Sequence, residues 1–156
     1  MTVELKEASK VVRGITHIKP TSVVLEAGHF NVLLGQTGSG KTVGFGWAIA
    51  PTLLEDKDFF PPAGAPYALV IAPTRELALQ VKRELSWLYA ETGAQVTSTV
   101  GGMDMRDERR ALERGTHMVV ATPGRLRDHI QRGSIDLTAI RAVVMDEADE
   151  MLDLGF

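Results

Sequence analysis

Residues 35–42 read Gly-Gln-Thr-Gly-Ser-Gly-Lys-Thr and match the pattern G-x-x-x-x-G-K-[ST] in full. An apolar run at residues 30–35 leads into this stretch, and residues with helical spacing follow it. Glycines at these positions allow backbone N–H groups to turn toward one anion, and the start of the following helix adds positive potential there. The pattern therefore predicts a loop that holds the phosphates of ATP or GTP.

The chemistry of such a loop assigns roles to its residues. We expect the Lys41 ammonium to reach the β- and γ-phosphates and the Thr42 hydroxyl to bind Mg²⁺. A glycine-rich turn that binds nothing is the alternative, and the full motif between a strand and a helix argues against it. The predicted nucleotide-binding residues are Gly35, Gln36, Thr37, Gly38, Ser39, Gly40, Lys41 and Thr42.

Two carboxylates near the end of the chain could complete this site. Asp146 closes the apolar run at residues 141–146, and Glu147 follows it. Because ligands of open parallel sheets bind at the carboxyl ends of strands, we expect Lys41 and Asp146 to converge although 105 positions separate them. Asp146 would hold Mg²⁺, directly or through water, and Glu147 would act as general base on the attacking water. The alternative is an acidic helix start that only faces solvent.

Apolar or β-branched runs alternate with stretches of helical spacing along most of the chain. The runs lie at residues 30–35, 67–72, 94–100, 117–122 and 141–146. Nearly continuous apolar runs are typical of parallel strands that are covered on both faces. This alternation predicts an α/β fold with three layers and a mainly parallel sheet.

The first 29 residues follow a different pattern. The segments "TVELKEASKVV" and "TSVVLEAGHF" indicate two extended stretches, which we expect to form an antiparallel hairpin added to the sheet. The predicted organisation is a single domain over residues 1–156. It consists of an atypical β segment at residues 1–29 and the nucleotide-binding part at residues 30–156.

Composition restricts the setting of the protein. The 156 residues include 17 Lys and Arg against 20 Asp and Glu, and a net charge of −3 gives no overall attraction for nucleic acid. The absence of cysteine excludes disulfides and thiolate metal sites. No apolar run approaches the roughly 18 residues of a membrane span, and the first ten residues lack the core of a signal peptide. We expect a cytoplasmic protein without a membrane partner.

Five short motifs follow one another after the apolar run at residues 30–35. They read QTGSGKT at residues 36–42, PTRELA at 73–78, GG at 101–102, TPGR at 122–125 and DEAD at 146–149. In this order they resemble the N-terminal RecA-like domain of DEAD-box RNA helicases, over about residues 36–156. The resemblance implies a P-loop enzyme that uses ATP and Mg²⁺ and holds RNA by sequence-independent backbone contacts. The RNA-binding residues that it implies are Pro73, Thr74, Arg75, Gly102, Thr122, Pro123, Gly124 and Arg125.

The residues at these positions support an anion-binding rim in their own right. Residues 73–76 and 122–125 each follow a predicted strand and open a predicted helix. Backbone N–H groups, a hydroxyl and an arginine would then lie at the same rim, which suits phosphates. For either motif alone, ordinary helix capping is the alternative, with Thr122 as the capping hydroxyl.

The start of the chain departs from the helicase pattern. DEAD-box proteins carry an upstream aromatic residue and a glutamine-containing motif that reads adenine, whereas this chain has no glutamine before Gln36. Residues 1–35 instead resemble the opening of an ABC-transporter ATPase, although no LSGGQ-like segment follows. We therefore consider a chimera, natural or engineered, joined at the phosphate loop, beside a divergent helicase start. The alternative functions are an ABC-type transporter ATPase fragment and a recombinant P-loop scaffold without physiological activity.

The other end also departs from the family pattern. The chain stops ten residues after Asp146 and contains neither the Ser-Ala-Thr motif nor the second RecA-like domain of these helicases. That domain supplies arginine fingers, and such a finger contributes about 10³–10⁵ to the rate. The resemblance thus implies a truncated first domain that binds nucleotide, hydrolyses it slowly or not at all, and does not unwind RNA.

Two other patterns are interpreted as structural. The four histidines, His17, His29, His117 and His129, show no ligand spacing, so we expect them at the surface or at a strand edge. Residues 106–114 carry mixed charges at i,i+3 and i,i+4 spacing, which is typical of a helix that faces solvent.

Overall fold

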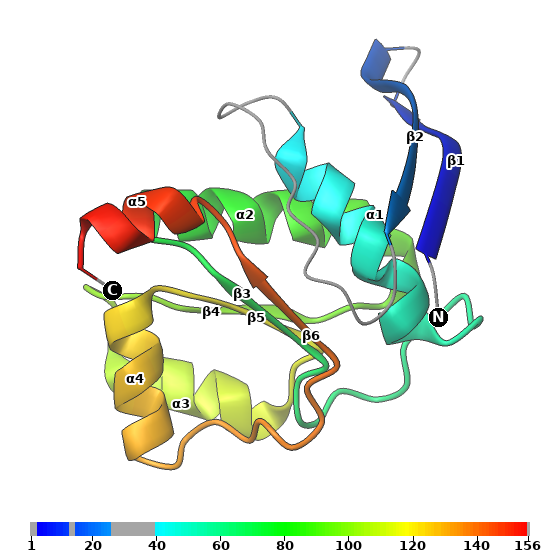
Figure 1. The fold of residues 1–156 in the computed structure, drawn as a ribbon. Coiled ribbons are helices and arrows are strands. Elements are labelled where there is room, and N and C mark those ends of the chain that lie inside the picture. Colours follow the sequence, from blue (N-terminus) through cyan, green and yellow to red (C-terminus); the bar gives the residue numbers. More distant parts are fainter. Residues whose placement is uncertain (1–2, 13–14, 26–39, 156) are drawn as a thin grey trace. The chain divides into compact units, whose positions relative to one another are not determined.

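The computed structural model describes residues 3–12, 15–25 and 40–155 (Figure 1). It divides into two compact units, residues 1–51 and residues 52–156. The boundary predicted between residues 29 and 30 lies outside the described residues, and so does the predicted strand at residues 30–35.

The N-terminal unit contains the predicted antiparallel hairpin. Strand β1 (Val3–Val12) pairs with β2 (Ile15–Leu25), from Val3 opposite Leu25 to Val12 opposite Ile15. In the described residues β1 and β2 form a two-stranded sheet of their own, and the expectation that this hairpin adds to the main sheet stays a prediction, because the predicted strand at residues 30–35 lies outside the described residues. Strands that follow each other in the chain commonly pair with each other, because a short connection brings them together at little entropic cost.

The helix that the phosphate-loop motif requires is present. Helix α1 (Lys41–Leu54) begins at Lys41, directly after Gly40, which has a φ of 87°. Lys41 and Thr42 are therefore the first two residues of a helix, at the positive end of its dipole.

The C-terminal unit is built on a parallel sheet of four short strands. These are β3 (Ala68–Ile71), β4 (Val96–Thr99), β5 (Met118–Ala121) and β6 (Ala142–Met145), in the order β4-β5-β3-β6. Every neighbouring pair is parallel. Each strand lies within one of the apolar runs that predicted it.

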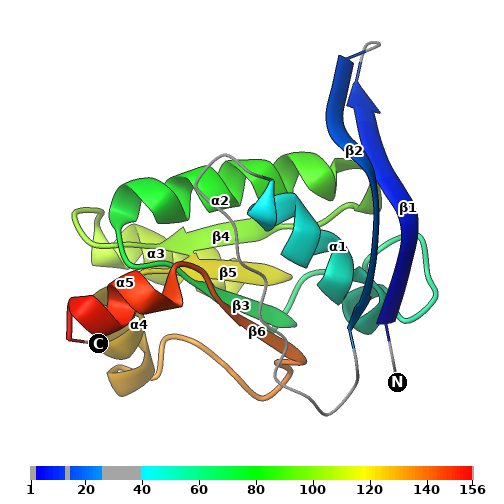
Figure 2. The same ribbon diagram turned by 45° about the horizontal axis from the view of Figure 1, so that its top comes forward.

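Helices cover both faces of this sheet. Helix α2 (Arg75–Leu88) lies on one face, and α3 (Met105–Arg114) and α4 (Pro123–Gln131) lie on the other (Figures 1 and 2). A 3₁₀ turn, η1 (Ala90–Thr92), follows α2, and the short helix α5 (Ala148–Asp153) follows β6. The predicted α/β fold with three layers and a parallel sheet is confirmed.

Burial on both faces of the sheet explains why the sequences of the two central strands, β3 and β5, are apolar throughout. Leu69 and Val119 belong to a buried cluster that includes Leu112 of α3 and Leu126 of α4. The intervening strand residues are also buried, and α2 contributes its own buried stripe of Ala78, Val81 and Leu85. Strand β6 differs, because it lies at the edge of the described sheet, and its Val143 and Met145 are exposed.

The loop before β3 is fixed to the start of β5 by backbone contacts. The Thr116 N–H donates to the Gly64 carbonyl (3.0 Å) in an isolated antiparallel bridge. His117 is buried beside this bridge: its Nε2 donates to the Pro61 carbonyl (2.7 Å), and its Nδ1 accepts from the Gln95 N–H (2.9 Å). Of the two positions expected for His117, the surface is excluded by its burial, whereas its place directly before β5 agrees with the end of a strand.

At Gly115 the backbone of the loop before β3 lies very close to the chain that leads into β5. Gly115 has a φ of 97°, and a Cβ atom added there would collide with the Ala63 carbonyl, which is backbone. Gly133 also has a positive φ, of 66°, yet nothing lies within 4 Å of its added Cβ. Substitution of Gly133 would therefore carry the energetic cost of a positive φ alone, whereas substitution of Gly115 would add the cost of a steric collision.

We predict that Gly115→Ala lowers the free energy of unfolding by more than about 2 kcal/mol, because strain and overlap with backbone add together. Gly133→Ala carries only the strain of the left-handed conformation, about 1–2 kcal/mol. Urea denaturation of both variants measures the difference. Equal losses would show that the loop before β3 moves away from Gly115 at no cost.

Candidate functional site

The four parallel strands end at the same level, and a sequence motif follows each of them. The register pairs Ile71 with Ala121 and with Met145, and it pairs Thr99 with Ala121. The residues that follow are 73–75 after β3, 101–102 after β4, 122–125 after β5 and 146–147 after β6. Motifs that are far apart in the sequence are thereby placed along one edge, which we call the motif edge.

Backbone hydrogen bonds continue the sheet for one residue beyond the strands. The Ala72 N–H donates to the Ala121 carbonyl (2.9 Å), and the Thr122 N–H donates to the Thr99 carbonyl (3.1 Å). The Asp146 N–H donates to the Ile71 carbonyl (2.8 Å). The ladder itself therefore fixes Thr122 and Asp146, the first residues of their motifs, and Ala72, which directly precedes Pro73.

Asp146 and Glu147 lie where β6 gives way to α5. Asp146 is buried. Glu147 has φ 52° and ψ 48°, a left-handed conformation that is rare for a residue with a side chain, and it occupies the position before the first residue of α5. A strained backbone of this kind persists only where the surroundings impose it, and it is common at functional sites.

Lys41 and Thr42 belong to the N-terminal unit, whereas Asp146 and Glu147 belong to the C-terminal unit. Gly35, Gln36, Thr37, Gly38 and Ser39 lie outside the described residues. The convergence of Lys41 with Asp146 therefore stays a prediction.

The PTRELA and GG motifs contact each other at the motif edge. Thr74 caps α2, since its hydroxyl accepts a hydrogen bond from the Leu77 N–H (3.3 Å). Arg75 is exposed, and its Nη2 lies 3.4 Å from the sulfur of Met103. Gly102 has a φ of 82°, and a Cβ added there would lie 2.5 Å from Nη1 of Arg75. The arginine of one motif thus passes directly over the glycine of the next.

The TPGR motif begins α4 as predicted, with Pro123 as its first residue. Thr122 has the extended backbone of a capping residue, but its hydroxyl makes no capping hydrogen bond with any described residue. The capping role expected for this side chain is therefore wrong, since the hydroxyl accepts from neither of the N–H groups at the second and third helical positions that a capping side chain would satisfy. Gly124 is exposed.

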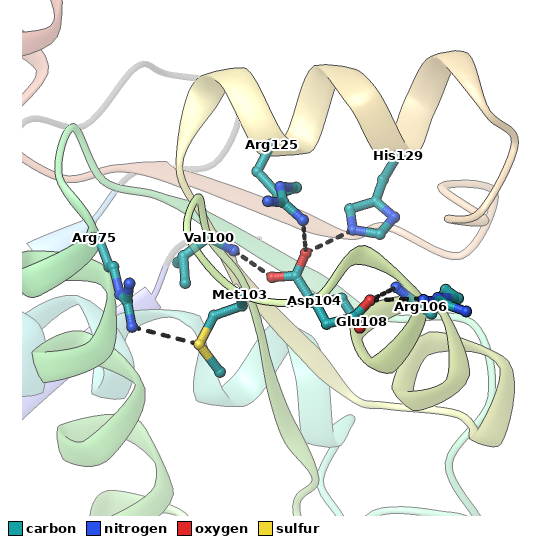
Figure 3. A network of polar contacts seen from close by, with 8 residues as sticks. All are labelled: Arg75, Val100, Met103, Asp104, Arg106, Glu108, Arg125 and His129. Carbon is teal, nitrogen blue, oxygen red and sulfur yellow. Dashed lines mark hydrogen bonds and ion pairs between the residues drawn. The ribbon is translucent and has the colours of Figure 1, made fainter.

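Arg125 faces the interior more than the rim. Its side chain is 14% exposed, and Nη1 lies 3.0 Å from Oε1 of Glu108 in α3. Figure 3 shows this guanidinium directed from α4 toward the Glu108 carboxylate.

Glu108 is a buried acid that the sequence analysis assigned to solvent. It is 6% exposed, and it also accepts from the Val100 N–H (2.6 Å) and contacts Nε2 of His129 (3.0 Å). His129 is fully buried, so its expected surface role is wrong as well. One signal was present in the sequence: Glu108 lies four positions before the buried Leu112, on the same stripe of the helix.

Other features of the described residues do not compete with the motif edge as a site. A pocket of about 330 Å³ lies at the opposite, amino end of the strands, between residues 63–66, the end of α3 and residues 133–136. No motif residue lines it. In the described part of the chain no three potential metal-ligating side chains come together, and no helix is long and apolar enough to cross a bilayer.

Comparison with known proteins bears on this arrangement. The family model described as DEAD/DEAH box helicase matches residues 17–156. The chain belongs to this family. Its match to the family includes every motif at the motif edge as well as the phosphate loop, so the predicted membership in the DEAD-box helicases is confirmed.

Individual relatives agree with the family match. The chain is 39% identical to the ATP-dependent rRNA helicase RRP3 of Saccharomyces cerevisiae, over 96% of this chain and 30% of that protein. It is 44% identical to the DEAD-box ATP-dependent RNA helicase 52A of Oryza sativa subsp. japonica, over 83% of this chain and 23% of that protein. The crystal structure of the yeast DEAD-box splicing factor Prp28 matches 79% of this chain and 29% of that one, with 35% identity and a TM-score of 0.69. The DEAD-box chain thus spans about a third or less of the length of these relatives.

The N-terminal resemblance to an ABC-transporter ATPase is not confirmed. The helicase family match begins at residue 17, and the alignment with RRP3 covers 96% of the chain. Helicase likeness therefore extends into the segment before the phosphate loop, where the sequence analysis found no helicase motif.

We predict that Gly102→Ala lowers the free energy of unfolding by about 1–2 kcal/mol, because alanine is strained at a positive φ. The added methyl group also displaces the Arg75 guanidinium, which ¹⁵N chemical shifts of the arginine side chain report. Gly101→Ala is the matched control, since nothing lies within 4 Å of its added Cβ and its φ is not positive. A loss of stability in both variants alike would contradict the assigned conformation of the Gly-Gly loop.

Proposed function

We propose that this chain is the ATP- and RNA-binding domain of a DEAD-box RNA helicase, with both ligands held along the motif edge. The observation that carries the proposal is the common level at which the four parallel strands end, followed by one motif each. Backbone amides, a carboxylate pair and an exposed arginine meet there, and these are the groups that phosphates and Mg²⁺ require.

In the nucleotide half of the site, the amides of residues 35–42 and the Lys41 ammonium would hold the triphosphate. The Thr42 hydroxyl and the Asp146 carboxylate are oxygen ligands of the type that Mg²⁺ prefers, and they would bind it. The ion would neutralise charge on the phosphates during transfer. Glu147 would accept a proton from the attacking water, and its left-handed backbone supports the view that its position is imposed.

In the RNA half, Arg75 would pair with a phosphate, beside the amides of Gly102 and Gly124 and the Thr122 hydroxyl. Pro73, Thr74 and Pro123 would contribute the turns that present these groups. Such contacts position a strand without reading its bases, so we expect weak, salt-sensitive and sequence-independent binding. A preference for RNA over DNA requires a contact to the 2′-hydroxyl.

Catalytic activity is expected to depend on a second RecA-like domain, which would complete the RNA groove and supply arginine fingers. By itself, the span of residues 1–156 is proposed to bind nucleotide and to hydrolyse it slowly at most, and to act in the cytoplasm. The antiparallel pairing of β1 with β2 and the missing glutamine motif favour the hypothesis of a chimera, whereas helicase likeness from residue 17 onward argues against a junction at the phosphate loop.

Titration with a fluorescent ATP analogue tests the nucleotide half. We predict that Lys41→Ala weakens Mg²⁺-dependent binding about tenfold or more, because charge-assisted hydrogen bonds to the phosphates are lost. Lys57→Ala is the control, since Lys57 is an exposed lysine of the loop after α1. If both variants bind as the parent chain does, the phosphate loop is a scaffold without a ligand.

The salt dependence of binding to single-stranded oligouridylate tests the RNA half. We predict that Arg75→Gln weakens binding and reduces the slope of log K against log salt by about 0.7, the contribution of one phosphate contact on a single strand. Arg83→Gln, an exposed position farther along α2, serves as the control and leaves the slope unchanged. An unchanged slope in Arg75→Gln would exclude a phosphate contact by this arginine.

A further inference from the structure

One buried carboxylate connects two of the segments that form the motif edge. Oε2 of Glu108 accepts from the Val100 N–H (2.6 Å), and Val100 directly precedes Gly101 and Gly102. Oε1 of Glu108 accepts from Nη1 of Arg125 (3.0 Å) and lies 3.0 Å from Nε2 of His129. The three partners approach the carboxylate from the loop after β4 and from α4, as Figure 3 shows.

The negative charge of Glu108 determines which groups in this cluster donate hydrogen bonds and which accept them. An ionised carboxylate only accepts hydrogen bonds, so Nε2 of His129 carries the proton that it donates to Glu108. Nδ1 of His129 has no hydrogen-bond partner among the described residues. The cluster thus joins one carboxylate to one guanidinium, and a buried histidine of the same helix as Arg125 contacts the same carboxylate oxygen.

Because the cluster is buried, the loss of any one of its members is costly. Glu108 is 6% exposed, Arg125 is 14% exposed and His129 is fully buried. Removing one member of a buried ion pair leaves the other charge without compensation, which is far more costly than removing both. Any movement of the Gly-Gly loop away from α4 would break the Val100 bond or the Arg125 pair, so the two segments keep one relative position.

We propose that Glu108 is a positioning residue that fixes the Gly101–Gly102 loop against the first turns of α4, and that Arg125 is its internal partner and not an RNA contact. The part of this proposal that concerns RNA rests on the proposed function. It changes the role that sequence resemblance implied for Arg125. The motif edge then presents Arg75 and the amides of Gly102 and Gly124 to the phosphates, on a frame that Glu108 holds.

Amide hydrogen exchange tests the coupling without any ligand. We expect Glu108→Gln to raise exchange about tenfold both at Val100–Gly102 and in the first turns of α4, with strand amides such as Val70 and Val119 unchanged. Glu113→Gln is the matched control, because Glu113 lies on the same helix in an exposed pair with Arg109 (2.8 Å) and is expected to alter neither segment. A rise in only one of the two segments, no rise, or an equal rise throughout the sheet would overturn the proposal.

A second pair of variants tests the role of Arg125. Arg125→Met leaves Glu108 buried without its cation and is expected to unfold more easily. The double variant Glu108→Gln with Arg125→Met removes both charges and is expected to unfold nearly as the parent chain does. We expect this double variant to bind oligouridylate more weakly than the parent chain does, but with the same slope of log K against log salt. Loss of about 0.7 from that slope would make Arg125 a phosphate contact and overturn its assignment as an internal partner.

The two measurements separate this inference from the proposed function. If the parent chain does not bind oligouridylate at any salt concentration, the RNA half of the proposed function fails. Hydrogen exchange in Glu108→Gln still decides whether the buried carboxylate couples the two segments.

Discussion

The hydrogen-bonded register of four parallel strands is the constraint on which the candidate site depends. Because Ile71, Thr99, Ala121 and Met145 lie at one level, the residues that follow them emerge along one edge. The bonds from the N–H groups of Ala72, Thr122 and Asp146 extend this order by one residue into the motifs. A slip of one residue in any pair would exchange the side chains on the two faces of a strand and move a motif by about 3.3 Å, so core packing and site geometry are specified together.

The elements of this sheet were predictable because burial on both faces leaves a clear trace in sequence. A four-residue strand such as Met118–Ala121 is buried at every position and therefore reads as an uninterrupted apolar run. The motifs were equally visible, since a strand that ends in a turn and a helix needs glycine, proline or threonine at defined places. Such runs do not indicate the order in which the strands pair, because that order depends on contacts between distant segments. The same limit explains why the hairpin was predicted from its two extended segments but the order of strands in the main sheet was not.

Contacts between side chains from different helices were beyond the reach of sequence patterns. Glu108 stands among residues with the alternating charges of a solvated helix, and its partners lie 17 and 21 positions away. The exposed pairs of the same helix, Arg109 with Glu113 and Arg110 with Asp107, are the ones that i,i+3 and i,i+4 spacing predicted. Local spacing thus identified the pairs that contribute little and missed the buried one, because burial is decided by α4 and β4.

The burial of Arg125 bears on how a chain with a net charge of −3 could hold an anionic strand. A buried ion pair adds little net stability, since desolvation offsets most of its attraction, but it strongly disfavours arrangements in which either charge is unpaired. Glu108 and Arg125 together add no net charge at the rim, yet in the proposed arrangement they fix where the rim's uncharged donors point. Amides that are already oriented lose little freedom when a phosphate binds. Affinity at such an edge would therefore come from preorganised backbone groups together with Arg75, and it would need no basic surface.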